Sequence, residues 1–233
     1  MSDLKADLKE YIDPLVTHVF VADQSYFLYM KIAESAEAIN RANLGIALGV
    51  IQESLADSYI LALTKLFEPP SLRYLTRSIP GAIEFLKSNR TVLKILQAPN
   101  VECLVKDFEQ KMGYTILTDK ISKTTDLISH LRSSIPSLDK IKSCNLSRTL
   151  DVLKTHRDKR VAHPEAIGLN SLPKTTWKDA QNLLNYAKYF IGIVGWVFLS
   201  TAYGVNHGEY LLSRDARRSA EAMERLFKMA KLI

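Results

Sequence analysis

The sequence predicts an all-α protein, and three observations lead to that fold class. Apolar residues recur at helical spacing along most of the chain, no segment alternates apolar and polar residues as a strand does, and no Asn-Gly or Asp-Gly pair marks a hairpin turn. The composition, with 47% hydrophobic and 24% charged residues, is that of an ordinary soluble globular protein. We therefore expect residues 1–233 to form one all-α domain.

Two long helices are predicted in the first third of the chain. The first is expected from about Asp13 to Arg41, with Pro14 in its first turn, where the missing proline N–H is tolerated. The second is expected from about Leu44 to Phe67, because the pair Pro69-Pro70 ends it. Apolar positions of the first helix include Val16, Phe20, Phe27, Met30 and Ala33. The positions expected to be buried in the second helix are Ile51, Leu55, Ile60, Leu63 and Phe67. The aromatic residues Phe20, Tyr26, Phe27 and Tyr29 are expected to pack in the core rather than to stack on bases.

The segment of about residues 70–145 is less regular, and we predict that it is a helical insertion packed on a simpler bundle. Short helical stretches are expected at about 81–87, 101–112 and 120–131. Because such helices are too short to be stable alone, they must dock on the rest of the chain. Residues that interrupt them are Pro80, Pro99, Gly113 and Pro136.

Three further helices are predicted after this segment. The first begins near Asn145 or Ser147 and ends before Pro164. The next is capped by Thr175 or Thr176 and runs through about Tyr203. It contains the uncharged run 189–206, which is at the lower length limit for a membrane span and is diluted by glycines, so we interpret it as a buried central helix. The last helix, at about 210–232, has a basic face that we interpret as solvated surface.

The charge distribution is uneven. Between Asp119 and Arg160 there are ten Lys or Arg and five Asp or Glu, and this surplus of five accounts for most of the net charge of +6. Such a surface either attracts a polyanion such as RNA or is a solvated face without a partner.

The cysteine content and the N-terminus both favour a cytoplasmic protein. Cys103 and Cys144 are too few for a disulfide framework and lack the spacing of a zinc site, which fits a reducing cytosol. The first residues do not show the basic and then apolar pattern of a secretory signal.

The stretch His156 to Pro164 carries the strongest functional signal. At about 100° per residue, Leu146, Leu150, Leu153 and Arg157 fall on one stripe of a helix. Arg157 therefore occupies a core-facing position, although a buried guanidinium without a partner is costly. It must face a carboxylate, a water-filled cleft or an anion. A local conflict of this kind is expected at a functional site.

A resemblance to the HEPN superfamily lies in the run Arg157-Asp158-Lys159-Arg160-Val161-Ala162-His163. It is similar to the R-x4-6-H motif, in which a polar residue directly follows the arginine and a histidine comes four to six residues later. Ala162-His163 followed by Pro164-Glu165 resembles the abortive-infection U (AbiU-like) branch, and so does the helical segment 57–68. The resemblance covers the two long helices, the motif helix and the helix after it, but hardly residues 70–140.

This resemblance implies a HEPN-like four-helix up-and-down bundle, with the additional helices inserted between the second and third core helices. It also implies a metal-independent endoribonuclease of the toxin or antiphage-defence type, and we expect no cofactor. Attack of an RNA 2′-hydroxyl on the neighbouring phosphate needs proton removal, stabilisation of charge and protonation of the leaving 5′-oxygen. His163 suits the proton transfers and Arg157 suits the phosphate. Asp158 can orient the imidazole or pair with an arginine.

One copy of the motif supplies only one well-placed histidine, whereas the reaction benefits from two proton-transfer groups. We therefore predict a homodimer with a composite site at its two-fold axis, and the resemblance implies the same arrangement. The expected partners are an RNA such as a tRNA or an mRNA and an antitoxin protein, without a membrane. On an unbroken α-helix Arg157 and His163 would lie about 120° apart, so either the last turn bends or the two enter the cleft from different sides.

Alternatives remain for the residues around the motif. His156 shares a helical face with Arg160 and His163, and it is either a substrate-binding histidine or merely exposed. Lys159 and Arg160 either position phosphates or form solvated salt bridges. For the motif as a whole, the alternative is an intrachain ion-pair network of Arg157 and Asp158 with His163 capping a helix end. A separate hypothesis for the function is a non-catalytic helical module that binds RNA, a nucleotide or a protein through the same cleft.

Overall fold

The computed structural model describes residues 3–71, 73, 75–93, 101–103, 105, 106, 110, 121, 123–137, 146–162, 173–203 and 210–233. Within these ranges the chain is built from helices and contains no strand. The all-α prediction is therefore confirmed for the described part of the chain.

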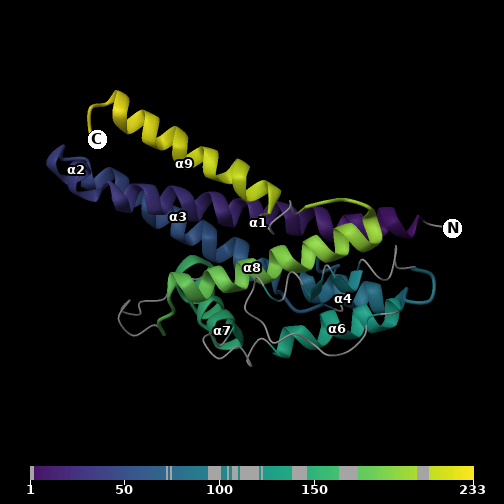
Figure 1. Cartoon of the computed structure of the whole chain (residues 1–233). Coiled ribbons are helices and arrows are strands. Elements are labelled where there is room, and N and C mark those ends of the chain that lie inside the picture. Colours follow the sequence, from purple (N-terminus) through teal and green to yellow (C-terminus); the bar gives the residue numbers. More distant parts are fainter. Residues whose placement is uncertain are drawn as a thin grey trace.

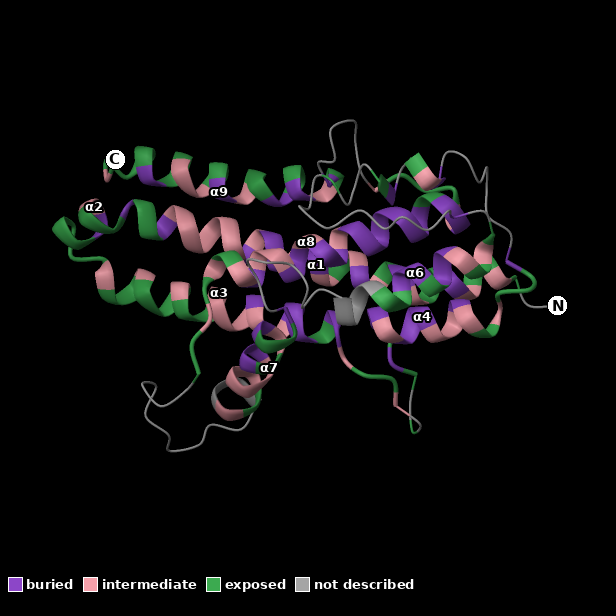
Figure 2. Ribbon diagram, turned by 60° about the horizontal axis from the view of Figure 1, so that its bottom comes forward, coloured by how far each residue is buried: buried purple, intermediate pink, exposed green. Residues whose placement is uncertain are grey.

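Helix α1 (Leu4–Glu34) is the axis of the molecule. It contacts α3 (Gly45–Leu66) and α9 (Leu211–Met229) over one part of its length, and it also contacts α4 (Ile79–Ser88) and α8 (Trp177–Val194). Figure 1 shows α9 and α3 along one half of α1, and α8, α4 and α6 (Thr124–Ser137) beside the other half. Figure 2 shows that buried residues concentrate in this second half, whereas α9 and the far end of α3 are largely exposed.

The predicted start of the first helix was wrong. Helix α1 begins at Leu4, where Asp3 accepts a hydrogen bond from the Lys5 backbone N–H at 3.0 Å, and Pro14 lies in its interior. An interior proline costs a helix about 3 kcal/mol. Burial of the upstream apolar stripe outweighs that cost, because its side chains are fully buried at helical spacing. They are Leu8, Ile12, Leu15 and Val19.

The predicted end of that helix at Arg41 was also too late. Helix α1 ends at Glu34, and the short helix α2 (Ala36–Arg41) follows after Ser35. Ala33, which was expected among the apolar contacts, is exposed. The other apolar positions expected in this helix are half-buried.

Helix α3 has the predicted bounds, but its first half does not face a core. Leu63 and Phe67 are buried as expected, whereas Ile51 is 43% exposed, and Ile46 and Val50 are more exposed still. The prediction of a buried Ile51 was therefore wrong. Among the described helices, α3 is the one long and apolar enough to cross a membrane, by length and composition alone.

Helix α8 forms the predicted buried centre. Thr176 caps it by accepting from the Asp179 N–H at 3.1 Å, and the residues from Tyr189 to Val194 are buried. It ends before the predicted Tyr203, because it passes at Gly195 into the π-helix η4 (Gly195–Leu199). A Cβ at Gly195 would lie 2.4 Å from the Tyr203 ring, so the glycine permits the close approach of Tyr203.

The segment predicted as an insertion is described in part. Ser78 caps α4 by accepting from the Gly81 N–H at 3.2 Å, and α4 contacts both α1 and α6. The predicted helix at 101–112 lies largely outside the described residues, although Val101 and Val105 are helical and buried. The insertion itself stays a prediction.

Helix α9 carries the predicted basic face on its solvent side. Arg218 and Lys228 pair with acidic residues of the same helix, at 2.9 and 2.8 Å. The Arg217 guanidinium lies over the Phe27 ring of α1 at 5.2 Å. The exposed basic residues are Arg214, Arg217, Arg218, Arg225, Lys228 and Lys231.

Candidate nuclease motif and adjoining cavity

The motif lies where helix α7 (Leu146–His156) passes into the π-helix η2 (Arg157–Ala162). Helix α7 packs against α8 and α3, and η2 also contacts α3. On the predicted stripe Leu146 and Leu153 are buried, and the Arg157 side chain is 23% exposed. Arg157 is thus largely buried at the end of an apolar stripe, as the sequence predicted. Short π-helical segments occur frequently at functional sites.

A carboxylate faces the Arg157 guanidinium. The Arg157 Nε donates to Asp158 Oδ1 at 2.7 Å, and the Asp158 side chain is 55% exposed. Of the two roles predicted for Asp158, the structure shows the ion pair with an arginine. An ion pair this exposed adds little stability, so its main physical effect is on the orientation of the guanidinium.

His156 is anchored rather than merely exposed. Its Nε2 lies 2.8 Å from the Pro173 carbonyl oxygen, and because a carbonyl only accepts, Nε2 carries a hydrogen and donates it. The imidazole is half-buried, and Nδ1 is left as the nitrogen that can act on a ligand. The His156 ring is thus half-buried and hydrogen-bonded, and substrate binding by this histidine stays a prediction.

The predicted face shared by His156, Arg160 and His163 was counted with an α-helical period. The period changes to that of a π-helix at Arg157, so this count does not apply beyond His156. The Lys159 side chain is half-buried, and for Arg160 the structure describes the backbone only. His163 lies outside the described residues, and so do Lys120, Lys140 and Lys142 of the predicted basic segment upstream of the motif.

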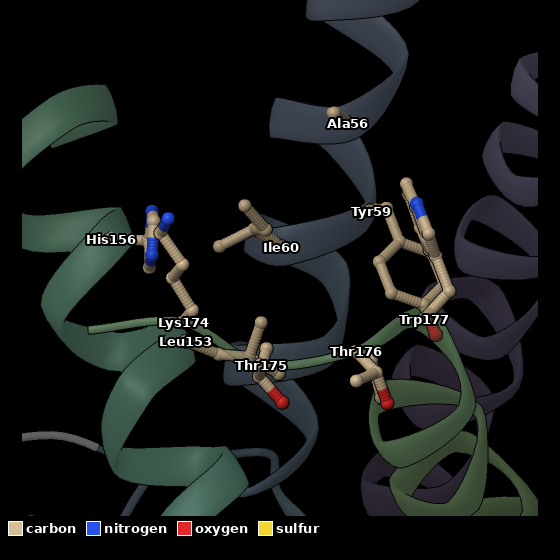
Figure 3. A pocket seen from close by; sticks show the side chains of 10 residues that line it. Ala56, Tyr59, Ile60, Leu153, His156, Lys174, Thr175, Thr176 and Trp177 are labelled. Carbon is tan, nitrogen blue, oxygen red and sulfur yellow. The ribbon is translucent and has the colours of Figure 1, made fainter. Parts of the chain in front are cut away.

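A cavity of about 280 Å³ adjoins the motif between α3, α7 and the start of α8, and we call it the His156 cavity. Figure 3 shows the His156 ring and the Lys174 side chain together on one side, and the Tyr59 and Trp177 rings on the other. The lining residues are Ala56, Tyr59, Ile60, Leu153, His156, Lys174, Thr175, Thr176, Trp177 and Ala180.

The aromatic wall of the cavity is rigidly packed. The Trp177 ring centroid lies 4.7 Å from that of Tyr29, 5.1 Å from that of Tyr59 and 5.6 Å from that of Tyr26. Aromatic pairs at such distances hold one another in place. The predicted core packing of Tyr26 is therefore confirmed, whereas Tyr29 is half-buried and packs on Trp177, the residue that both tyrosines support.

Behind this wall lies a buried charge network that the sequence did not reveal. Asp23 is 1% exposed; it accepts from Lys188 Nζ at 2.7 Å and from the Ser213 hydroxyl, and so ties α1 to α8 and α9. Burial, and to a smaller extent the charge of Asp23, raises the pKa of Tyr59 well above its ordinary value. Tyr59 thus remains a neutral phenol and is no candidate base.

Sequence reasoning missed the residues that complete the His156 cavity. Tyr59 appeared only as part of a helical segment, and Trp177 only as the residue after a cap. Lys174 gave no signal at all, because only the tertiary structure shows that it lies beside His156. The predicted cap at Thr176 was the one indication in the sequence of where α8 begins beside the cavity.

The all-α fold of the described residues and the arginine at a charged helix end agree with the expectation of a HEPN-type protein. The family model described as AbiU2, a HEPN family, matches residues 5–219. The chain belongs to the AbiU2 family of HEPN proteins, and the AbiU-like resemblance of the motif is confirmed. The match also runs through residues 70–140, which the motif-based resemblance hardly covered. Searches of curated proteins and of solved structures give no match.

Membership of this family indicates a function of the abortive-infection, nuclease-associated kind. HEPN domains of this kind typically act on RNA and are often dimeric toxins.

Proposed function

We propose that this protein is a metal-independent endoribonuclease of the toxin or antiphage-defence type, with Arg157, Asp158 and His163 as its catalytic residues. The observation that carries the proposal is the Arg157 side chain, 23% exposed, whose guanidinium is held by Asp158 at the start of a π-helix in an AbiU2-family chain. A bond through Nε orients the guanidinium so that its terminal N–H groups can form a fork toward phosphate oxygens.

The reaction is transfer of the phosphoryl group within the RNA strand. A histidine removes the proton of the 2′-hydroxyl, and the resulting oxygen attacks the adjacent phosphorus. Arg157 stabilises the additional negative charge on the phosphorane. The bond to the 5′-oxygen breaks, that oxygen takes a proton from a second histidine, and the products carry a 2′,3′-cyclic phosphate and a 5′-hydroxyl. Lys159 and Arg160 hold flanking phosphates.

We assign these two roles to the two copies of His163 in an isologous homodimer, which has the motif at its two-fold axis. In this proposal residues 1–233 form one HEPN-like domain, with the segment at about 70–145 inserted between its second and third core helices. The protein acts in the cytoplasm on an RNA such as a tRNA or an mRNA. A protein antitoxin that covers the motif is the expected means of control.

Cleavage of RNA in EDTA, followed by analysis of the product ends, tests the proposal. We expect 2′,3′-cyclic phosphate ends from the wild type and no cleavage by His163→Ala, while sedimentation shows a dimer for both. Normal cleavage by His163→Ala would overturn the assignment. Salt-dependent RNA binding without products, weakened by Arg157→Ala but not by His163→Ala, would instead identify a non-catalytic binding module.

A further inference from the structure

We propose that the His156 cavity binds one unpaired nucleobase of a single-stranded RNA segment, next to the phosphate that Arg157 holds. The inference rests on the proposed function and adds the part of the substrate that the protein recognises. Because a paired base cannot leave its stack without cost, the preferred substrate is a single-stranded loop or end.

The lining of the cavity divides into an apolar part and a cationic edge. Tyr59, Trp177, Ile60 and Leu153 supply aromatic and aliphatic surface, which suits the flat face of a base. Trp177 is half-buried and braced by three tyrosines, so it presents a fixed surface that loses little entropy when a ligand binds.

The cationic edge is formed by His156 and Lys174, which lie on the same side of the cavity. No carboxylate is among the ten lining residues. The His156 ring is fixed through Nε2 by the Pro173 carbonyl, so Nδ1 is the nitrogen that can meet a ribose hydroxyl, and the Lys174 ammonium is the group that can meet a phosphate. A nucleotide has these two ends, because its base is flat with an apolar face and its phosphate is anionic.

The size and the position of the cavity agree with this occupant. At about 280 Å³ it is slightly smaller than the roughly 300 to 1,000 Å³ of pockets for drug-sized ligands, which fits one base rather than a stack. Arg157 directly follows His156 in the chain but does not line the cavity, so the phosphate that Arg157 holds belongs to a nucleotide next to the one whose base enters the cavity. Thr175 adds a hydroxyl that can both donate and accept along the edge of the base.

Tryptophan fluorescence tests this subsite. The chain has two tryptophans, so Trp196→Phe leaves Trp177 as the sole emitter. We expect each nucleoside monophosphate that fits to quench Trp177 in a saturable way, and inorganic phosphate to leave it unchanged. Lys174→Ala should weaken the binding about tenfold, whereas Lys178→Ala, an exposed lysine outside the cavity, should not. Absence of quenching by all four monophosphates, or equal quenching by phosphate alone, would overturn the inference.

A second measurement determines which bases are preferred next to the cleaved phosphodiester bond. Ala56→Phe places a ring in the cavity from α3, and circular dichroism reports whether the variant folds. We expect it to cleave RNA with a changed base preference next to the cut, and an unchanged preference would contradict the subsite. If the wild type quenches with nucleotides but cleaves no RNA, the endoribonuclease proposal fails and the base pocket stands. If it cleaves RNA but shows no quenching, the pocket fails alone.

Discussion

Arg157 and its neighbour Asp158 form a hydrogen-bonded ion pair, with 2.7 Å between Nε and Oδ1, at the residue where α7 becomes a π-helix. The exposed carboxylate thus holds the guanidinium of the partly buried Arg157 side chain in one orientation. The contact therefore fixes the phosphate-binding group of the motif at the residue where the helix type changes.

Removal of the Asp158 carboxylate should therefore slow RNA cleavage without abolishing it. In Asp158→Ala the guanidinium keeps its charge but loses its orientation, and we expect the rate constant to fall about tenfold, which is about 1.4 kcal/mol of transition-state stabilisation. Single-turnover cleavage measures the effect. Asp151→Ala, at an exposed position of α7 outside the motif, is the matched control and should cleave at the wild-type rate. Equal rates for the two variants would show that Asp158 does not position Arg157.

The buried Asp23 should contribute strongly to stability. Asp23→Ala leaves the Lys188 ammonium, only 15% exposed, without this partner, and loss of one member of a buried ion pair costs about 3 to 5 kcal/mol. Glu10→Ala removes the exposed ion pair with Arg77 and should cost less than about 1 kcal/mol. Urea unfolding compares the two free energies of unfolding. Similar values for both variants would mean that the Asp23 network is not structural.

Tyr59 should tolerate loss of its hydroxyl but not of its ring. The hydroxyl is buried and has no hydrogen-bond partner, so Tyr59→Phe should leave the free energy of unfolding unchanged or raise it by up to about 1 kcal/mol. Tyr59→Ala opens a cavity beside Trp177 and should cost about 3 to 5 kcal/mol. A large loss in Tyr59→Phe would mean that the hydroxyl has a partner after all.

Tyr59 should also make the free energy of unfolding depend on pH in the alkaline range. Because burial raises the pKa of Tyr59 in the folded state, its contribution is fully present below the ordinary tyrosine pKa of about 10 and is lost as the pH rises toward the raised value. The free energy of unfolding should therefore fall more steeply above about pH 10 in the wild type than in Tyr59→Phe. Parallel pH curves for the two proteins would contradict the pKa shift.

Two glycines give opposite expectations for substitution by alanine. Gly195→Ala brings a Cβ to 2.4 Å from the Tyr203 ring and 3.0 Å from the Thr201 carbonyl oxygen, and such overpacking costs about 1 to 3 kcal/mol. At Gly49, in exposed helix α3, a Cβ meets nothing within 4 Å, so Gly49→Ala should stabilise by about 0.5 to 1 kcal/mol. Thermal unfolding decides the signs, and a stable Gly195→Ala protein would show that Tyr203 does not close over Gly195.

Periodicity in the sequence was sufficient for the helices whose apolar stripes are long and uninterrupted. It identified α3 and the buried centre of α8, and it placed Arg157 at the end of the Leu146 and Leu153 stripe. It failed at Pro14, because a proline is usual in the first turn of a helix, whereas here the buried apolar stripe upstream extends the helix to Leu4. It also failed at Ile51, because an apolar side chain shows no sign of whether another helix covers it.

The features of the candidate site that the sequence did not predict have similar physical causes. A π-helix has no sequence signature in this chain, so the faces of the motif were counted with the wrong period after His156. The wall of the His156 cavity joins residues far apart in the chain, such as Tyr59 and Trp177, and only tertiary packing brings them together.

The measurement that tests the central claim most directly is cleavage of RNA in EDTA by the wild type and by Arg157→Ala, with identification of the ends produced. The account predicts 2′,3′-cyclic phosphate ends from the wild type without added metal. It also predicts a rate at least about 100-fold lower for Arg157→Ala, because the donor aimed at the phosphorane is lost. Cleavage that requires a divalent metal, or an Arg157→Ala protein that cleaves at the wild-type rate, would contradict it.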